Sequence, residues 1–308
     1  MATERPFVPR ADFIENAFER RFQGLLRSAR QDRTWHVVAA VPGSGKSYGI
    51  ADLVASAGAV KRPDGQTRLP ILAVCAPKGK AGPSALGIAL SLAFGAVPRM
   101  TGYARRTWLV GQVARAEVEL IVIDDAHDLT LDHLAYVKEL TDNLAAPPYG
   151  RRVGLCLVSA SGQGVIPLQE TFRTRQELIW RQFRRRLDPG RPYCLVLGHT
   201  ADEVREICAG YEDVYRDQFP GLRLVRWARS IDDWLTHPVL DPERSGRVTM
   251  SHLANLVRLG LGRAAAAGLD DVTGELLHEV ASLMTLRAEE VALVDGEPSA
   301  AGPPTRVG

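Results

Sequence analysis

The sequence has few cysteines and no long apolar run. Its cysteines show neither the spacing of a metal site nor that of a disulfide framework. No apolar stretch approaches the roughly 20 residues that a membrane span requires, and residues 1–6 lack the apolar core of a signal peptide. We therefore expect a cytoplasmic protein whose cysteines are reduced. They are Cys75, Cys156, Cys194 and Cys208.

Lysine is also scarce, because arginine supplies nearly all of the 38 basic residues. Arginine clusters are therefore weaker evidence of function here than they would be in a lysine-rich chain. The net charge of +2 is too small to require a nucleic-acid partner. The 308 residues suffice for one large α/β domain and a smaller second domain.

The most informative motif is the glycine-rich segment 40–47, which directly follows the apolar run 35–39. It has the pattern of a phosphate-binding P-loop between a strand and a helix, except that Ala40 stands where the pattern has glycine. In such a loop, backbone N–H groups surround the phosphates, Lys46 reaches the β- and γ-phosphates, and the Ser47 hydroxyl binds Mg²⁺. We expect an ATP site formed by Pro42, Gly43, Ser44, Gly45, Lys46, Ser47 and Tyr48.

A second motif, Leu-Ile-Val-Ile-Asp-Asp at 120–125, follows about 80 residues later. Four apolar residues before two acids predict a buried parallel strand with carboxylates at its C-terminal edge, where ligands of α/β sheets bind. Asp124 is expected to hold Mg²⁺ through its water shell. Asp125 is expected to orient or deprotonate the attacking water, a task more often given to Glu. Alone, such a run is more often a plain strand–turn junction, but its position after a P-loop favours the catalytic interpretation.

Strand-like and helical segments alternate over the first two thirds of the chain, which predicts a parallel sheet with right-handed crossovers. From residue 200 onward the patterns are helical, apart from an irregular stretch at 218–247. We therefore expect an α/β nucleotide-binding domain at 1–198, an α-helical lid at 199–295 and a disordered tail at 296–308. The five expected strands are 35–41, 70–76, 119–124, 153–159 and 193–197.

Two further features bear on catalysis. Ser159 ends the fourth strand, where P-loop ATPases place a polar residue that senses the γ-phosphate, although a serine-rich turn explains it as well. The arginine-rich segment within 170–187 is expected to form one helix, with an apolar stripe of Leu178, Ile179, Phe183 and Leu187. It is either a solvated basic helix or the source of an arginine that reaches the γ-phosphate of a neighbouring subunit. For that role we expect Arg184 first and Arg181 second.

These motifs, in this order, resemble the small AAA+ ATPases of transposition, the TniB/TnsC type related to the phage Mu target-selection ATPase. The resemblance covers about 10–290 and includes segments 76–84, 123–127 and 180–187. It implies a P-loop NTPase of AAA+ type with a five-stranded parallel sheet, flanking helices and a C-terminal α-helical lid. It also implies ATP and Mg²⁺ as cofactors and a homo-oligomeric ring or filament. The implied partners are duplex DNA, a transposase and a target-selector protein.

In that family, the loop after the second strand and the following helical segment touch DNA. Carrying this over by position makes six residues candidate contacts to DNA phosphates, with a solvated basic surface as the alternative. These residues are Lys78, Lys80, Arg99, Thr101, Arg105 and Arg106.

The sequence departs from the family at three places. Asp125 replaces the usual Glu, from which we expect slow hydrolysis, and Ala40 replaces the first P-loop glycine. His252 stands where a lid motif has an arginine that touches the nucleotide, and Arg258 and Arg263 are the alternatives for that contact.

The resemblance implies an ATPase that assembles on duplex DNA with ATP and recruits or activates a transposase, with hydrolysis driving disassembly. Two other functions stay open. One is a helicase loader or insertion-sequence helper ATPase, a class that also favours Asp-Asp after the third strand. The other is a signalling switch NTPase.

Overall fold

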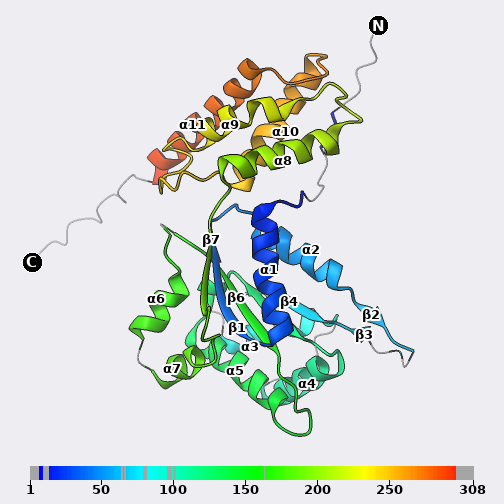
Figure 1. Cartoon of the computed structure of the whole chain (residues 1–308). Helices are drawn as coiled ribbons and strands as arrows, with labels where there is room; N and C mark the ends of the chain where they lie inside the picture. The colour runs from blue at the N-terminus through cyan, green and yellow to red at the C-terminus, as the bar shows by residue number, and fades with distance from the viewer. Residues whose placement is uncertain are drawn as a thin grey trace, which may run out of the picture. The chain divides into compact units, whose positions relative to one another are not determined.

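A computed structural model of the chain describes residues 7–9, 14–63, 65, 67–78, 82–95, 99, 102–162, 164–175 and 177–295. The expected tail at 296–308 lies outside these residues. By its contacts the chain divides into two units, and Figure 1 labels most of their helices and strands. The first comprises Ala11–His199 with Thr249–Ser251. The second comprises Met1–Arg10, Thr200–Val248 and His252–Gly308.

The first unit is built on a five-stranded parallel sheet with the order β4-β5-β6-β1-β7 (Figure 1). Each predicted strand is present, and β1 is buried along its whole length because it has a neighbour on both sides. The predicted α/β fold is therefore confirmed. The strands are β1 Trp35–Ala40, β4 Ile71–Cys75, β5 Leu120–Asp124, β6 Gly154–Ala160 and β7 Tyr193–Val196.

Alternate residues of β1 enter two different cores, one on each face of the sheet. Val37 belongs to the core with α3, α4, α5, α6 and α7, whereas Val38 belongs to the core with α1 and α2. The helices on the first face are α3 Pro83–Leu92, α4 Gly102–Arg115, α5 Leu131–Ala145, α6 Pro167–Thr174 and α7 Leu178–Arg184; those on the second are α1 Ala17–Asp32 and α2 Lys46–Ala57.

The arginine-rich segment forms two short helices, α6 and α7, and not the single helix predicted over 170–187. Phe183 is fully buried and its ring packs 4.9 Å from that of Trp35. Trp180 is also buried, against Phe172, whereas Leu178 is 62% exposed. The predicted apolar stripe was therefore wrong at Leu178, because the aromatic ring of Trp180 occupies the core.

A short antiparallel hairpin, β2 Val60–Lys61 with β3 Thr67–Arg68, follows α2. This hairpin was not predicted, because strands of two residues are too short to show a periodic pattern in the sequence.

The second unit is helical. It contains α8 Ala201–Tyr215, the 3₁₀ turn η2 Leu224–Trp227, α9 Ala228–Leu235, α10 Met250–Ala266 and α11 Gly274–Asp295. The stretch 218–247, expected to be irregular, thus contains η2 and α9, and α9 buries Ile231 and Leu235. Among the described residues, no helix is long and apolar enough to cross a membrane.

Gly154 begins β6 at the point where the strand meets the C-terminal end of α1. A Cβ at this position would lie 2.3 Å from the carbonyl oxygen of Ala29, a backbone atom that cannot rotate away. We expect Gly154→Ala to lower the free energy of unfolding by about 1–3 kcal/mol in urea denaturation. The control is Gly24→Ala within α1, where a Cβ meets nothing within 4 Å. It should raise stability by up to about 1 kcal/mol. Equal effects of the two changes would contradict the packing of α1 on β6.

Candidate functional site

The P-loop connects β1 to α2 and has the backbone that phosphate binding requires. Gly43 and Gly45 have φ values of 72° and 103°, in the left-handed region that glycine adopts without strain. In the described part of the chain no side chain caps the N-terminus of α2, so its first N–H groups remain for a ligand. Ser44 is buried, and its Oγ has no hydrogen-bond partner among the described residues. These features fit a bound phosphate group.

Lys46 begins α2 and is almost fully buried. Its Nζ lies 3.5 Å from the carbonyl oxygen of Ala40. Burial lowers the pKa of Lys46, although the nearby carboxylates of Asp124 and Asp125 act to raise it. A buried ammonium in this position would be stabilised by an anion such as a β- or γ-phosphate.

Ser47 and Asp124 meet at the carboxyl edge of the sheet. The Ser47 hydroxyl donates a hydrogen bond of 2.7 Å to Oδ2 of Asp124, and Oδ1 of Asp124 accepts the N–H of Asp125 at 2.9 Å. A hydroxyl and a carboxylate are oxygen ligands of the kind that Mg²⁺ prefers. These two residues therefore fit a Mg²⁺-nucleotide, and the metal would supply charge neutralisation for phosphoryl transfer.

Asp125 follows β5 with a φ of 52°, a left-handed conformation that costs an aspartate less than most residues. It precedes the 3₁₀ turn η1, Ala126–Asp128, and its side chain is half-buried. Ser159 is fully buried, and its Oγ has no hydrogen-bond partner among the described residues. Because β6 lies between β5 and β1, Ser159 belongs to the strand between the acids and the P-loop.

Glu19 of α1 also belongs to this site and was not predicted from the sequence. Its carboxylate packs against the P-loop and α2: a Cβ at Gly45 would lie 2.8 Å from Oε1, and one at Gly49 would come within contact distance of Oε2. Glu19 is 3% exposed, and burial, with a smaller effect of Asp52, raises its pKa from 4.5 to about 8. The sequence held one indication that Glu19 is buried: this acid lies next to Phe18 and near Phe22, on the buried face of α1.

The two arginines expected to act in trans lie on the outer side of α7. Arg181 and Arg184 are exposed, because Trp180 and Phe183 occupy the buried side of this helix. Arg184 makes a long hydrogen bond of 3.5 Å to the carbonyl oxygen of Phe172. Within the described residues, no hydrogen bond or ion pair joins either arginine to the P-loop of its own chain. Their role in a neighbouring active site stays a prediction.

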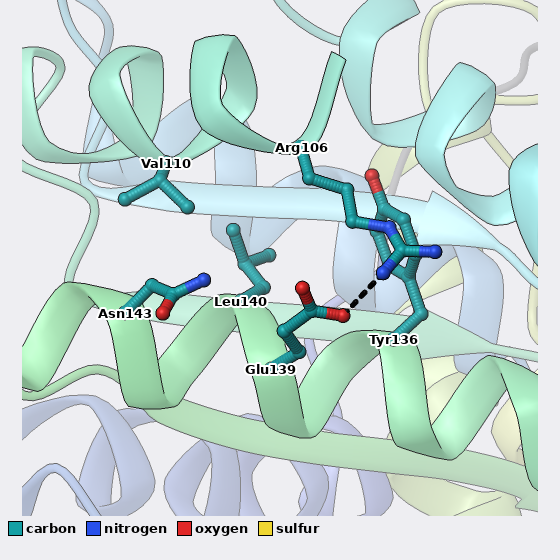
Figure 2. Close-up of a pocket in the computed structure, with 6 residues that line it drawn as sticks. All are labelled: Arg106, Val110, Tyr136, Glu139, Leu140 and Asn143. Carbon is teal, nitrogen blue, oxygen red and sulfur yellow. Dashed lines mark hydrogen bonds and ion pairs between the residues drawn. The ribbon is translucent and has the colours of Figure 1, made fainter. Parts of the chain in front are cut away.

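The six candidate DNA contacts have different surroundings. Lys80 and Thr101 lie outside the described residues, whereas Lys78 and Arg99 are exposed. Arg106 is ion-paired with Glu139 at 2.5 Å, and its guanidinium lies 5.4 Å from the centre of the Tyr136 ring (Figure 2).

Arg105 is half-buried, with an Nε that has no hydrogen-bond partner in the described part of the chain. Lys78 and Arg99 are therefore the members of the set best placed to meet a phosphate.

His252, which stands in the place of the lid arginine, belongs to the second unit. It is half-buried, and burial lowers its pKa. A nucleotide contact from His252, Arg258 or Arg263 stays a prediction.

Known proteins share parts of this sequence and this fold. Residues 29–160 match the family model described as an AAA domain, and no curated protein matches the sequence. Residues 29–160 of the first unit therefore have the fold of an AAA domain.

Solved structures of similar fold include the Aeropyrum pernix ORC2 protein in its ADPNP–ADP complexes, with a TM-score of 0.59, 12% identity, and 86% of this chain and 66% of that chain covered. The Aeropyrum pernix ORC1 protein in complex with DNA gives a TM-score of 0.54 at 15% identity, covering 92% and 69%. Drosophila ORC bound to DNA gives 0.50 at 14% identity, covering 96% and 74%. The chain thus spans about two thirds of the length of the first of these proteins.

The raised pKa of Glu19 predicts a pH-dependent stability. Between pH 4.5 and about 8 the folded chain keeps this proton while the unfolded chain has lost it. The free energy of unfolding should therefore fall as pH rises, by about 1.4 kcal/mol per pH unit from this group alone. Glu19→Gln, which cannot ionise, should remove that part of the slope in urea denaturation at about pH 5, 6.5 and 8.

The matched control is Glu170→Gln, whose side chain is exposed on α6 and, among the described residues, is paired with Arg173 alone. It should leave the pH dependence of unfolding unchanged. A wild-type slope that survives in Glu19→Gln would show that Glu19 is ionised in the folded protein.

Proposed function

We propose that this protein is an ATP-dependent switch that assembles on duplex DNA in its ATP-bound state and disassembles after hydrolysis. The nucleotide-binding part of this proposal rests on one observation: the Ser47 hydroxyl donates a hydrogen bond to the Asp124 carboxylate beside the P-loop. That pair, with Lys46 and Asp125 adjacent, is the set of groups that Mg²⁺-dependent phosphoryl transfer uses.

Each residue of the site has a distinct proposed role. Lys46 neutralises the β- and γ-phosphates, while Ser47 and Asp124 hold Mg²⁺. Asp125 orients or deprotonates the attacking water, and Ser159 senses the γ-phosphate. Because the Asp125 side chain is one methylene shorter than that of Glu, it holds the water farther away, and we expect slow hydrolysis.

In the proposed assembly, α7 contacts the neighbouring subunit. Its exposed arginines are well placed to reach a neighbouring subunit, because the buried Trp180 and Phe183 fix the helix on the sheet. An arginine supplied in trans stabilises the transition-state charge, so that hydrolysis occurs only between assembled subunits. We propose Arg184 for this role, with Arg181 as the second choice.

Duplex DNA is the proposed partner of the assembled form. Two of the similar structures contain DNA, and the exposed Lys78 and Arg99 offer contacts to phosphates. The finer proposal, that the assembly recruits or activates a transposase together with a target-selector protein, is supported by the resemblance in sequence alone.

A helicase-loading function is the second candidate. The acid pair Asp124-Asp125 after the third strand favours it, because this class of ATPase also has two aspartates there. If this protein stimulates strand transfer by a transposase, the first candidate is supported. If it stimulates the loading of a helicase onto DNA, the second candidate is supported.

Mixing two inactive variants tests assembly. Arg184→Ala should bind ATP but neither hydrolyse it nor form stable oligomers, and Lys46→Ala should lose ATP affinity by roughly a hundredfold or more. Mixing them should restore part of the ATPase rate. At a mixed interface, the intact P-loop of the Arg184→Ala subunit meets the intact arginine of the Lys46→Ala subunit.

The control replaces Arg184→Ala by Arg173→Ala, a change of the neighbouring helix at a residue whose side chain is 75% exposed. This variant should be active without mixing. A site completed within one chain would show no rescue at any mixing ratio. Absence of ATP-dependent duplex binding at low salt would contradict the DNA part of the proposal.

A further inference from the structure

A cleft of about 400 Å³ opens at the amino ends of β1 and β6. Its lining includes Trp35, the first residue of β1, and Val153, which directly precedes β6. The nucleotide site lies at the carboxyl ends of the same parallel strands, so the cleft is at the opposite edge of the sheet. Three arginines contribute to its wall: Arg33, Arg152 and Arg186.

Arg186 is held in a fixed orientation. Its guanidinium lies 5.3 Å from the centre of the Trp35 ring and forms an ion pair with Asp142. The Trp35 indole N–H is itself fixed by a 3.2 Å hydrogen bond to the carbonyl oxygen of Val153. A planar cation positioned in this way suits bidentate contact with a phosphate.

Asp142 is the carboxylate that lines the cleft, and it is shared. It accepts Lys138 at 2.8 Å in addition to Arg186. Burial acts to raise the pKa of Asp142, but the hydrogen bonds from Arg186 and Lys138 outweigh it and lower the pKa. Asp142 is therefore ionised and already engaged by two cations. Arg152 is exposed and makes no hydrogen bond or ion pair within the described part of the chain.

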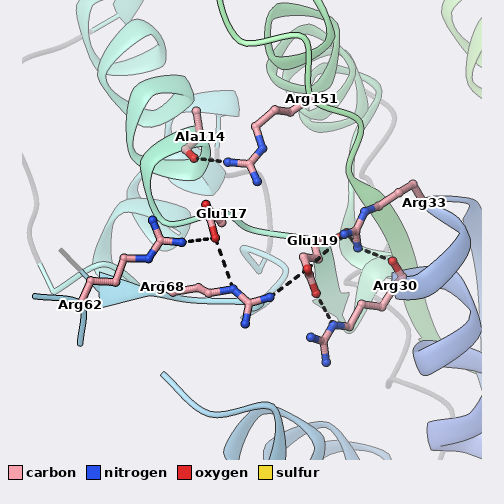
Figure 3. A network of polar contacts seen from close by, with 8 residues as sticks. All are labelled: Arg30, Arg33, Arg62, Arg68, Ala114, Glu117, Glu119 and Arg151. Atoms are coloured by element: carbon pink, nitrogen blue, oxygen red, sulfur yellow. Dashed lines mark hydrogen bonds and ion pairs between the residues drawn. The ribbon is translucent and has the colours of Figure 1, made fainter. Parts of the chain in front are cut away.

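Arg33 connects the cleft to a larger group of arginines (Figure 3). Glu119 accepts ion pairs from Arg30, Arg33 and Arg68 at 2.6–3.1 Å. Glu117 is shared by Arg68 and Arg62. Each carboxylate thus serves two or more guanidinium groups, so that four arginines share two glutamates in the ion pairs of the described residues.

We propose that this cleft binds phosphate groups, supplied by the backbone of a nucleic acid, with Arg152 and Arg186 as the contacts. The fixed guanidinium of Arg186 and the unpaired Arg152 provide the local site. The series of arginines that continues from Arg33 favours a ligand with repeated phosphates over a single one. Only the choice of DNA as the phosphate source rests on the proposed function.

The test uses Arg152→Glu, because this exposed side chain makes no hydrogen bond or ion pair with the described residues whose loss would disturb folding. Binding to a duplex of about 30 base pairs is measured by fluorescence anisotropy with an ATP analogue over a range of salt concentrations. Arg152→Glu should weaken binding about tenfold or more at low salt and make the slope of log K against log salt shallower by about 0.9 or more. Arg152→Lys should retain the wild-type slope, and the control Arg173→Glu on α6 should change neither quantity.

A second arm distinguishes the source of the phosphate. Calorimetry with pyrophosphate is performed in the Lys46→Ala background, where the P-loop does not compete. Loss of pyrophosphate binding on adding Arg152→Glu supports the cleft, even if the wild-type protein binds no duplex and the proposed function fails. Duplex binding that requires ATP but is indifferent to Arg152→Glu, together with no Arg152-dependent pyrophosphate binding, overturns the cleft and leaves the proposed function standing. Arg152-dependent binding of polyglutamate as tight as that of the duplex would also overturn it.

Discussion

The hydrogen bond between Ser47 and Asp124 is the contact on which the nucleotide site depends. It joins the first turn of α2 to the end of β5, two strands away from β1 in the sheet. Such a contact exists only because β6 inserts between β1 and β5 in parallel register, which also brings Ser159 between the P-loop and the acids. The geometry of the candidate site is thus a consequence of strand order, and any change that shifts β6 would separate its two halves.

The folded chain buries ionisable groups at the P-loop, where burial disfavours their charged forms. Lys46 is buried, with its pKa lowered by that burial, and the Glu19 carboxyl on the other side of the loop has its pKa raised. Both shifts show that charge is poorly solvated there. A bound nucleotide would stabilise the lysine, and its negative charge would further favour the protonated form of Glu19. Nucleotide binding should therefore raise the free energy of unfolding of this unit by more than the contacts of Lys46 alone would provide.

The sequence predicted the sheet well because each of the five strands is a continuous apolar run, and the P-loop has a fixed spacing of special residues. Glu19 could not be predicted, since its environment depends on how closely α1 packs against Gly45 and Gly49. Trp180 replaced Leu178 in the core for a similar reason, because the choice depends on the break between α6 and α7. The arginine cleft is assembled from α5, the start of β1, the segments before β1 and β6, and the segment after α7, and no local pattern indicates it.

The central claim is that Ser47 and Asp124 bind Mg²⁺ together with the nucleotide, and titration calorimetry of ATP with and without Mg²⁺ tests it most directly. Wild-type protein should bind ATP more tightly with Mg²⁺ than with a chelator present. Asp124→Asn, which keeps the size of the side chain but removes its charge, should bind ATP with nearly the same affinity in both conditions. A Mg²⁺ dependence in Asp124→Asn as large as that of the wild type would contradict the assignment of this edge of the sheet as the metal–nucleotide site.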